Sequence, residues 1–168
     1  MKKNSGFTLL ELIITVALIS IVTAFAIPSM TTFSQNDRLT TNINTLVGHL
    51  GLARSESVKR SQQVSICASS DNSTCTGNWE DGWLVYADTN NDGSLNGTDE
   101  ILRVQQALGS GNNMTPTGIG TQVTYDNRGF VTAGGSFLLC DYRAGDFGKT
   151  LTITNTGRVR TEANSTCP

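Results

Sequence analysis

A single apolar run near the N-terminus restricts what this chain can become. Residues 7–27 are apolar apart from Glu11 and a few hydroxyl residues, and the next charged residue is Asp37. As a helix rising about 1.5 Å per residue, the run is about 30 Å long, which matches the hydrocarbon core of a bilayer. Because Lys2 and Lys3 precede it, the positive-inside rule predicts a cytoplasmic N-terminus and an exported remainder.

Two simpler interpretations of the run are open. A secretory signal has an apolar core of about 7–15 residues before a small-residue cleavage site, whereas this run is longer and leads into a helical pattern. A plain signal anchor accounts for the hydropathy but not for Glu11. A charge at mid-span costs about 2.5–3.5 kcal/mol, so we expect a partner for this carboxylate. A cut after Gly6 would supply one, because the new amino group of Phe7 is a cation that Glu11 of a neighbouring helix could meet.

The leader carries a specific resemblance. Residues 3–12, Lys-Asn-Ser-Gly-Phe-Thr-Leu-Leu-Glu-Leu, closely resemble the class III signal of type IV pilins and type II secretion pseudopilins. The resemblance implies that a prepilin peptidase removes residues 1–6 by cutting between Gly6 and Phe7, and that it methylates the new N-terminus. It also makes Glu11 the assembly residue. Pro28 matches the helix-kinking proline of that family, which lacks an N–H and clashes with the preceding turn.

Beyond the predicted transmembrane segment, residues 7–28, the pattern stays helical before it changes. An apolar stripe at steps of three and four predicts an amphipathic continuation over residues 29–60 that lies on a sheet. The stripe consists of Leu39, Ile43, Leu46, Leu50 and Ala53. Residues 61–168 form short segments rich in Val, Ile, Thr and aromatics between polar turns, which predicts an exported antiparallel β domain. The predicted strands are 62–68, 82–87, 100–106, 121–125, 129–132, 136–141, 150–154 and 158–162, and residues 109–120 are predicted to be a flexible loop. The predicted fold is therefore α+β and pilin-like.

The cysteines favour two disulfides. Cys67, Cys75, Cys140 and Cys167 include no C-x-x-C pair, and His49 is the only histidine, which argues against zinc. An even cysteine number in an exported domain indicates disulfides. Of the three possible pairings we favour Cys67–Cys75, which closes a short polar loop, and Cys140–Cys167, which ties the tail to a preceding strand.

Little in the sequence indicates an enzyme. The single histidine lies in the predicted helix, and no Gly-x-Ser-x-Gly motif is present, so we predict a chain without catalytic residues. We expect His49 to be a packing or surface residue and Trp79, Trp83 and Tyr86 to be core residues. The net charge of −2 excludes a generally cationic nucleic-acid binder, although it allows a local basic patch.

Internal motifs narrow the resemblance. Residues 78–88, Asn-Trp-Glu-Asp-Gly-Trp-Leu-Val-Tyr-Ala-Asp, and residues 154–160, Thr-Asn-Thr-Gly-Arg-Val-Arg, are similar to the GspH/FimT group of minor pilins and H-type pseudopilins. The implied function is that of a minor type IV pilin near the pilus tip, which initiates assembly or captures DNA. A structural pseudopilin of type II secretion and a membrane-anchored adhesin are the alternatives. The implied partners are other pilins, the prepilin peptidase and the inner membrane.

A polar segment matches an oxygen-rich calcium loop. Oxygen-bearing side chains fall at the ligand positions, with a glycine at the sixth position. The candidate ligands are Asp88, Asn90, Asp92, Ser94, Asn96 and Asp99. Strands replace the usual flanking helices, however, and a hairpin turn without metal is the alternative because Asn, Asp and Gly favour turns.

The C-terminal region contains a candidate DNA-binding element. In Gly-Arg-Val-Arg, residues 157–160, a strand would place Arg158 and Arg160 on one face about 6.6 Å apart, where both could engage phosphates. Arg143 and Lys149 add local positive charge. The element resembles the Gly-Arg-x-Arg motif of FimT-type minor pilins that bind DNA in natural transformation, which implies double-stranded DNA as a partner. The alternative is a tight turn at Gly157, with Arg160 a solvated charge on an edge strand.

Overall fold

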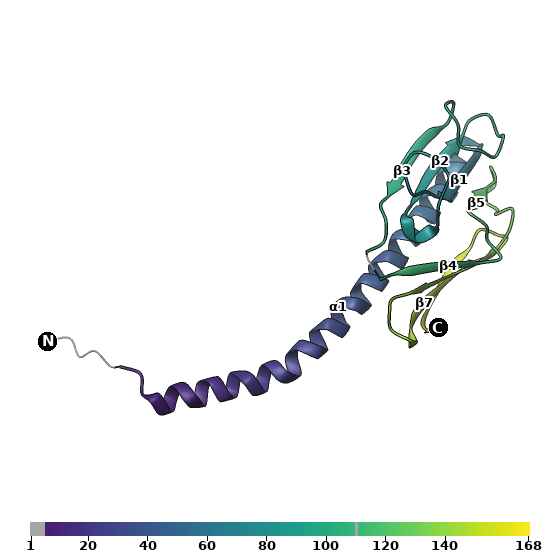
Figure 1. Ribbon diagram of the computed structural model, residues 1–168. Coiled ribbons are helices and arrows are strands. Elements are labelled where there is room, and N and C mark those ends of the chain that lie inside the picture. Colours follow the sequence, from purple (N-terminus) through teal and green to yellow (C-terminus); the bar gives the residue numbers. More distant parts are fainter. Residues whose placement is uncertain (1–5, 110) are drawn as a thin grey trace. The chain divides into compact units, whose positions relative to one another are not determined.

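The structure is a computed structural model that describes residues 6–109 and 111–168 (Figure 1). Residues 1–5 of the predicted leader and residue 110 of the predicted loop lie outside the described residues. The chain divides into two compact units, residues 1–37 and residues 38–168, and each is described by itself. One helix, α1 (Leu9–Arg60), contributes to both.

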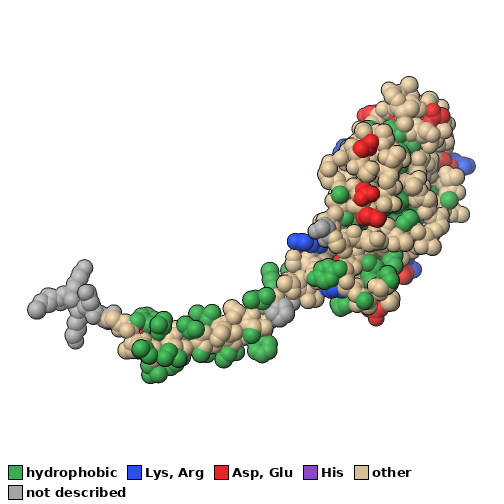
Figure 2. Space-filling model, in the orientation of Figure 1, with side chains coloured by type: hydrophobic (Ala, Val, Ile, Leu, Met, Phe, Trp, Pro, Cys, Tyr) green, Lys and Arg blue, Asp and Glu red, His purple; other side chains and the backbone are tan. Residues whose placement is uncertain are grey.

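In the first unit, α1 is apolar on all sides. Its large apolar side chains between Phe7 and Phe33 are 49–75% exposed, and Figure 2 shows them along the helix. The hydroxyl groups of Thr15, Ser20 and Thr23 donate to carbonyls of the preceding turn, so the helix itself satisfies them. Among the described residues α1 is the one helix long and apolar enough to cross a membrane. The helical backbone continues through position 28, and the kink at Pro28 stays a prediction.

In the second unit, α1 supplies one side of the core. The predicted stripe from Leu39 to Ala53 is buried, with each of its five side chains at most 2% exposed. The helix ends at Arg60, next to Lys59, where basic side chains complement the helix dipole. The helix therefore ends where the sequence predicted, and its buried face begins at Leu39.

The first sheet follows α1 in the chain. It has the order β3-β2-β1-β5, and every neighbouring pair is antiparallel. Its strands are β1 (Gln63–Ala68), β2 (Trp83–Asp88), β3 (Glu100–Gln105) and β5 (Gln122–Tyr125). A short 3-10 helix, η1 (Trp79–Asp81), precedes β2. Cys67, Leu84 and Tyr86 form a second small core with Cys75 and Leu95, so both faces of the sheet are covered and β2 is buried throughout.

The second sheet has the order β4-β6-β7-β8, again all antiparallel. Its strands are β4 (Asn113–Thr117), β6 (Gly135–Cys140), β7 (Gly145–Ile153) and β8 (Val159–Cys167). Together, α1 and the two sheets enclose one core. The α+β, pilin-like fold class is confirmed.

Three local predictions were wrong. Residues 113–117 were expected in a loop but form β4, an edge strand that tolerates Pro116 because an edge leaves some N–H positions unpaired. The predicted strand at 129–132 is only an isolated bridge between Tyr125 and Val131. The last two strands are longer than predicted, because β7 and β8 continue toward the Cys140–Cys167 disulfide.

The aromatic residues expected in the core are buried. Trp79, Trp83 and Tyr86 are at most 2% exposed. The indole N–H of Trp83 donates to Nδ1 of His49 at 2.9 Å, which joins β2 to α1. Burial, and secondarily the charge of Arg103, lower the pKa of His49, so the neutral ring that accepts this hydrogen bond is favoured.

Candidate functional site

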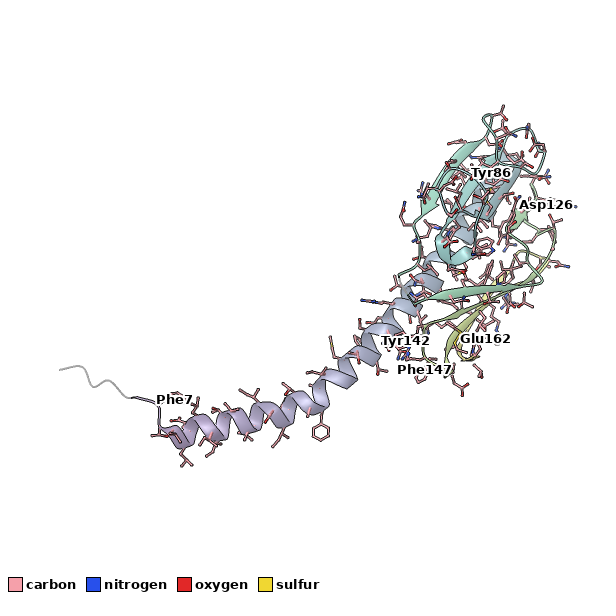
Figure 3. The ribbon with its side chains drawn as sticks, viewed as in Figure 1. Phe7, Tyr86, Asp126, Tyr142, Phe147 and Glu162 are labelled. Atoms are coloured by element: carbon pink, nitrogen blue, oxygen red, sulfur yellow. A yellow bond between two sulfur atoms is a disulfide. The ribbon has the colours of Figure 1, made fainter. Side chains whose placement is uncertain are left out.

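The first turn of α1 carries the predicted assembly residue. Thr8 caps the helix, because the Glu11 N–H donates to its Oγ1 at 3.2 Å. A Thr and a Glu three residues apart form the pattern of a capping box, and a carboxylate at a helix N-terminus interacts favourably with the helix dipole. Phe7 lies immediately before this turn and is exposed (Figure 3). Glu11 is exposed as well, so another chain can reach it.

The helix around Glu11 finds no cover among the described residues of its own chain. The buried apolar residues of the described chain begin at Leu39. Phe7 and residues 9–33 of α1, here called the apolar helix surface, therefore need lipid or other helices around them, because an apolar patch of this size is rarely left in water.

The two disulfides are the pairs favoured from sequence. Cys67 bonds to Cys75 across a separation of 8 residues, and Cys140 bonds to Cys167 across 27 residues. Gly148 makes room for the second bond, since a β-carbon there would lie 2.7 Å from Sγ of Cys167.

The Gly-Arg-Val-Arg element forms the end of the β7–β8 hairpin. Gly157 adopts φ +74°, and its N–H donates to the Thr154 carbonyl at 2.8 Å, which closes the turn. Arg158 and Arg160 are both exposed. The side chain of Arg160 lies 3.5 Å from Glu162 in an exposed pair. Such pairs contribute about 0–1 kcal/mol, so this contact leaves Arg160 accessible.

The structure does not bring the five predicted DNA-binding residues together. The side chain of Arg143 is only 13% exposed, pairs with Asp141 at 2.6 Å and lies over the ring of Phe147, so it offers little surface to a phosphate. Lys149 pairs with Ala163 of β8 and shares its side of β7 with buried Leu151, whereas Arg160 pairs with Thr152 on the other side. The structure thus does not group these two residues with Arg158 and Arg160, because local positive charge in the sequence does not show which way a side chain points. Contact of the two residues with DNA stays a prediction.

Gly157 also has a structural role. It is buried, and a β-carbon at this position would collide with the carbonyl oxygen of Gly129. The tight turn at Gly157, which was the alternative interpretation of the motif, is therefore present. It holds Arg158 at the surface, so the turn and an exposed Arg158 occur together.

Comparison with protein-family models decides the family. The model described as Type II transport protein GspH matches residues 42–157, which covers most of the chain. The chain belongs to the GspH family. A second model, the prokaryotic N-terminal methylation motif, matches residues 1–27. GspH-family membership and the methylation motif together identify a minor pilin-like or pseudopilin-like subunit.

Solved structures support the fold of this GspH-family chain. It is similar to the type IV minor pilin FimU of Pseudomonas aeruginosa in one crystal form, with 21% identity and a TM-score of 0.61 over 81% of this chain and 96% of that one. In a second crystal form the identity is 22% and the TM-score is 0.56, over 77% of this chain and 97% of that one. No curated protein sequence matches the chain.

The predicted calcium loop of this GspH-family chain connects β2 to β3. Buried Asp88 accepts hydrogen bonds from the N–H groups of Asp92 and Gly93. Asp99 accepts from those of Thr89 and Asn96. In the part of the chain that the structure describes, no three Asp, Glu, His or Cys side chains lie close enough to share a metal. These amide contacts favour the hairpin-turn alternative.

Calcium binding stays a prediction with a direct test. If the loop binds calcium, millimolar calcium stabilises the folded state by mass action, and the melting temperature of the chain rises. A melting temperature that is the same in calcium and in chelator would contradict the prediction. Asp92→Asn is the variant to compare, because within the described residues Oδ2 of Asp92 accepts hydrogen bonds from the side-chain amides of Asn90 and Asn96 alone.

Proposed function

We propose that this chain is a minor pilin that is cut between Gly6 and Phe7, anchored in the inner membrane by α1 and incorporated through α1 into a type IV pilus near its tip. The β domain then lies on the periplasmic side. The observation that carries the proposal is the apolar helix surface, which has an exposed carboxylate in its first turn and no cover from the rest of the described chain. Pilin-type processing is supported by the methylation motif over residues 1–27.

An H-type pseudopilin of type II secretion is the structural alternative, and the GspH family model favours it by its description. Both functions use the same helix. They differ in the neighbouring subunits, so the filament with which the chain copurifies separates them.

Mass spectrometry of sheared filaments tests the proposal. We expect the chain to begin at Phe7 with one methyl group on its amine. Gly6→Val is the matched variant, because a β-carbon at Gly6 meets nothing within 4 Å and the change therefore tests recognition by the peptidase and not the fold. It should leave a full-length chain in the membrane. A filament-borne chain that still carries residues 1–6 would contradict the proposal.

We propose DNA binding as a second function, on the observation that Arg158 and Arg160 are both exposed at the β7–β8 turn. Contacts to phosphates carry no base identity, so binding should be independent of sequence, with a Kd of about 1–100 μM at physiological salt.

Replacing both arginines tests this function. With the full chain in detergent and a fluorescent duplex, Arg158→Gln/Arg160→Gln should weaken binding about tenfold or more, and it should make the slope of log K against log salt shallower by about 1.8. The melting temperature should be unchanged, because exposed charges contribute little to stability.

The control for this experiment removes two positive charges elsewhere. Lys59 and Arg103 are exposed and line the cleft between the end of α1 and β3. Lys59→Gln/Arg103→Gln should change binding much less than the test variant. Equal effects of the two double variants would mean that only net charge matters and would reject a site at the β7–β8 turn.

A further inference from the structure

Two turns that are distant in the sequence touch through their glycines. One turn, residues 126–130, follows β5 and contains Gly129, and the other joins β7 to β8 and contains Gly157. Both glycines adopt positive φ, +79° and +74°. The carbonyl oxygen of Gly129 occupies the space that a β-carbon at Gly157 would take, so the two backbones approach as closely as glycine allows.

Arg54 of α1 lies against both glycines. Its Nε would be 3.1 Å from a β-carbon at Gly129 and 3.3 Å from one at Gly157. Its Nη2 donates to the carbonyl of Thr156 at 3.0 Å. The helix thereby fixes the two turns to each other, and Arg54 is a positioning residue for them.

Each of the two touching glycines has an arginine as its neighbour in the chain. Arg128 precedes Gly129, and Arg158 follows Gly157. The side chain of Arg128 is 76% exposed, and Arg158 is exposed as well. In the described part of the chain, neither Arg54 nor Arg158 belongs to an ion pair. Of these three arginines, only Arg128 has a carboxylate partner in the described chain, that of Asp126.

The turn that carries Arg128 is well ordered by hydrogen bonds. Asp126, labelled in Figure 3, accepts from the N–H groups of Arg128 and Phe130 and from Nε and Nη2 of Arg128. These hydrogen bonds lower the pKa of Asp126, and the largest contribution comes from the N–H of Phe130. The guanidinium also lies 5.5 Å from the centre of the Phe130 ring. Nη1 makes no hydrogen bond within the described chain. Arg128 is thus held in one position with a donor group left over, which reduces the entropy lost when it binds a ligand.

We infer that Arg128 and Arg158 form one binding surface for the phosphate backbone of duplex DNA, which Arg54 holds together. The inference rests on the proposed DNA-binding function and adds a contact on a second turn. Arginine presents fixed donor pairs that match phosphate oxygens. A duplex offers phosphates from two strands, whose charges follow one another about every 1.7 Å of axis, so donors on two adjacent turns can engage it together.

The test measures duplex binding by the full chain in detergent as a function of salt. We expect Arg128→Gln to weaken binding about 3- to 10-fold and to make the salt slope shallower by about 0.9, with Arg128→Gln/Arg158→Gln shallower by about 1.8. Arg128→Lys keeps the charge and should retain the wild-type slope. Arg103→Gln is the matched control, since Arg103 is an exposed arginine on β3, at the other edge of the first sheet from β5. It should leave the slope near that of the wild type.

The outcomes separate this inference from the function on which it rests. If the wild type binds and Arg158→Gln/Arg160→Gln weakens binding, while Arg128→Gln behaves like Arg103→Gln, then the second turn takes no part and the inference is overturned. If the wild type fails to bind duplex at low salt, DNA binding itself is overturned. Tighter binding of single-stranded than of duplex DNA would overturn the choice of duplex.

Discussion

Glu11→Val should leave the chain in the membrane and remove it from filaments. The substitution takes a carboxylate out of an apolar span, so insertion becomes easier by up to about 2.5–3.5 kcal/mol. In the proposed assembly, the neighbouring subunit's processed Phe7 amine loses its carboxylate partner. An interaction worth about 1.4 kcal/mol changes an equilibrium tenfold, so we expect incorporation to fall about tenfold or more. Immunoblots of membrane and sheared-filament fractions measure both quantities.

Two further variants assign the effect to charge. Glu11→Gln keeps a polar side chain in the first turn but loses the ion pair, and it should behave like Glu11→Val. Thr15→Val changes a polar residue one turn further along, whose hydroxyl is already bonded to the Leu12 carbonyl at 2.9 Å, and it should assemble normally. Normal incorporation of Glu11→Val would refute the pairing role of this carboxylate.

Loss of the Cys140–Cys167 disulfide should destabilise the fold more than loss of the Cys67–Cys75 disulfide. In the chain-entropy model, a cross-link over the separation of 27 residues stabilises the fold by about 3.5 kcal/mol. For a unit of this size, such a loss lowers the melting temperature by roughly 10 °C. The 8-residue separation between Cys67 and Cys75 corresponds to about 2.5 kcal/mol.

Reduction of single-disulfide variants measures each cross-link without changing the packing in the same step. Cys67→Ala/Cys75→Ala retains only the Cys140–Cys167 bond, and Cys140→Ala/Cys167→Ala retains only the other. Each is melted before and after reduction, and the first should show the larger drop. Free thiols in unreduced protein from the periplasm, or no drop on reduction, would contradict the predicted pairing.

The helix and the leader were the most predictable parts of this molecule. An apolar run with one carboxylate and a stripe at helical spacing are local patterns, and they gave α1 and its buried face from Leu39 to Ala53. The strands were less predictable. In β4 only Met114 is buried, so residues 113–117 lack the alternation that marks a strand. The turn after β5 has a strand-like composition, but Asp126 closes it by accepting backbone N–H groups.

The arginines show the limit of reasoning from neighbours in the sequence. Arg143 and Lys149 are close to Arg158 along the chain. Arg143 nevertheless pairs with Asp141, and Lys149 points to the side of β7 opposite Thr152, the residue that pairs with Arg160. Arg54 and Arg128 are distant along the chain, yet the structure places them beside the same turn. Their proximity depends on two glycines from different turns, a long-range contact that no local pattern encodes.

The packing of Gly157 changes how much a short motif can tell about homologous chains. Its positive φ and its contact with Gly129 are needed for the β7–β8 turn whether or not the protein binds a nucleic acid. A homologue that had lost such binding would still be selected to retain this glycine for folding. The glycine of a Gly-Arg-x-Arg motif therefore has little diagnostic value for the proposed DNA binding, and positions 128, 158 and 160 are the ones to compare.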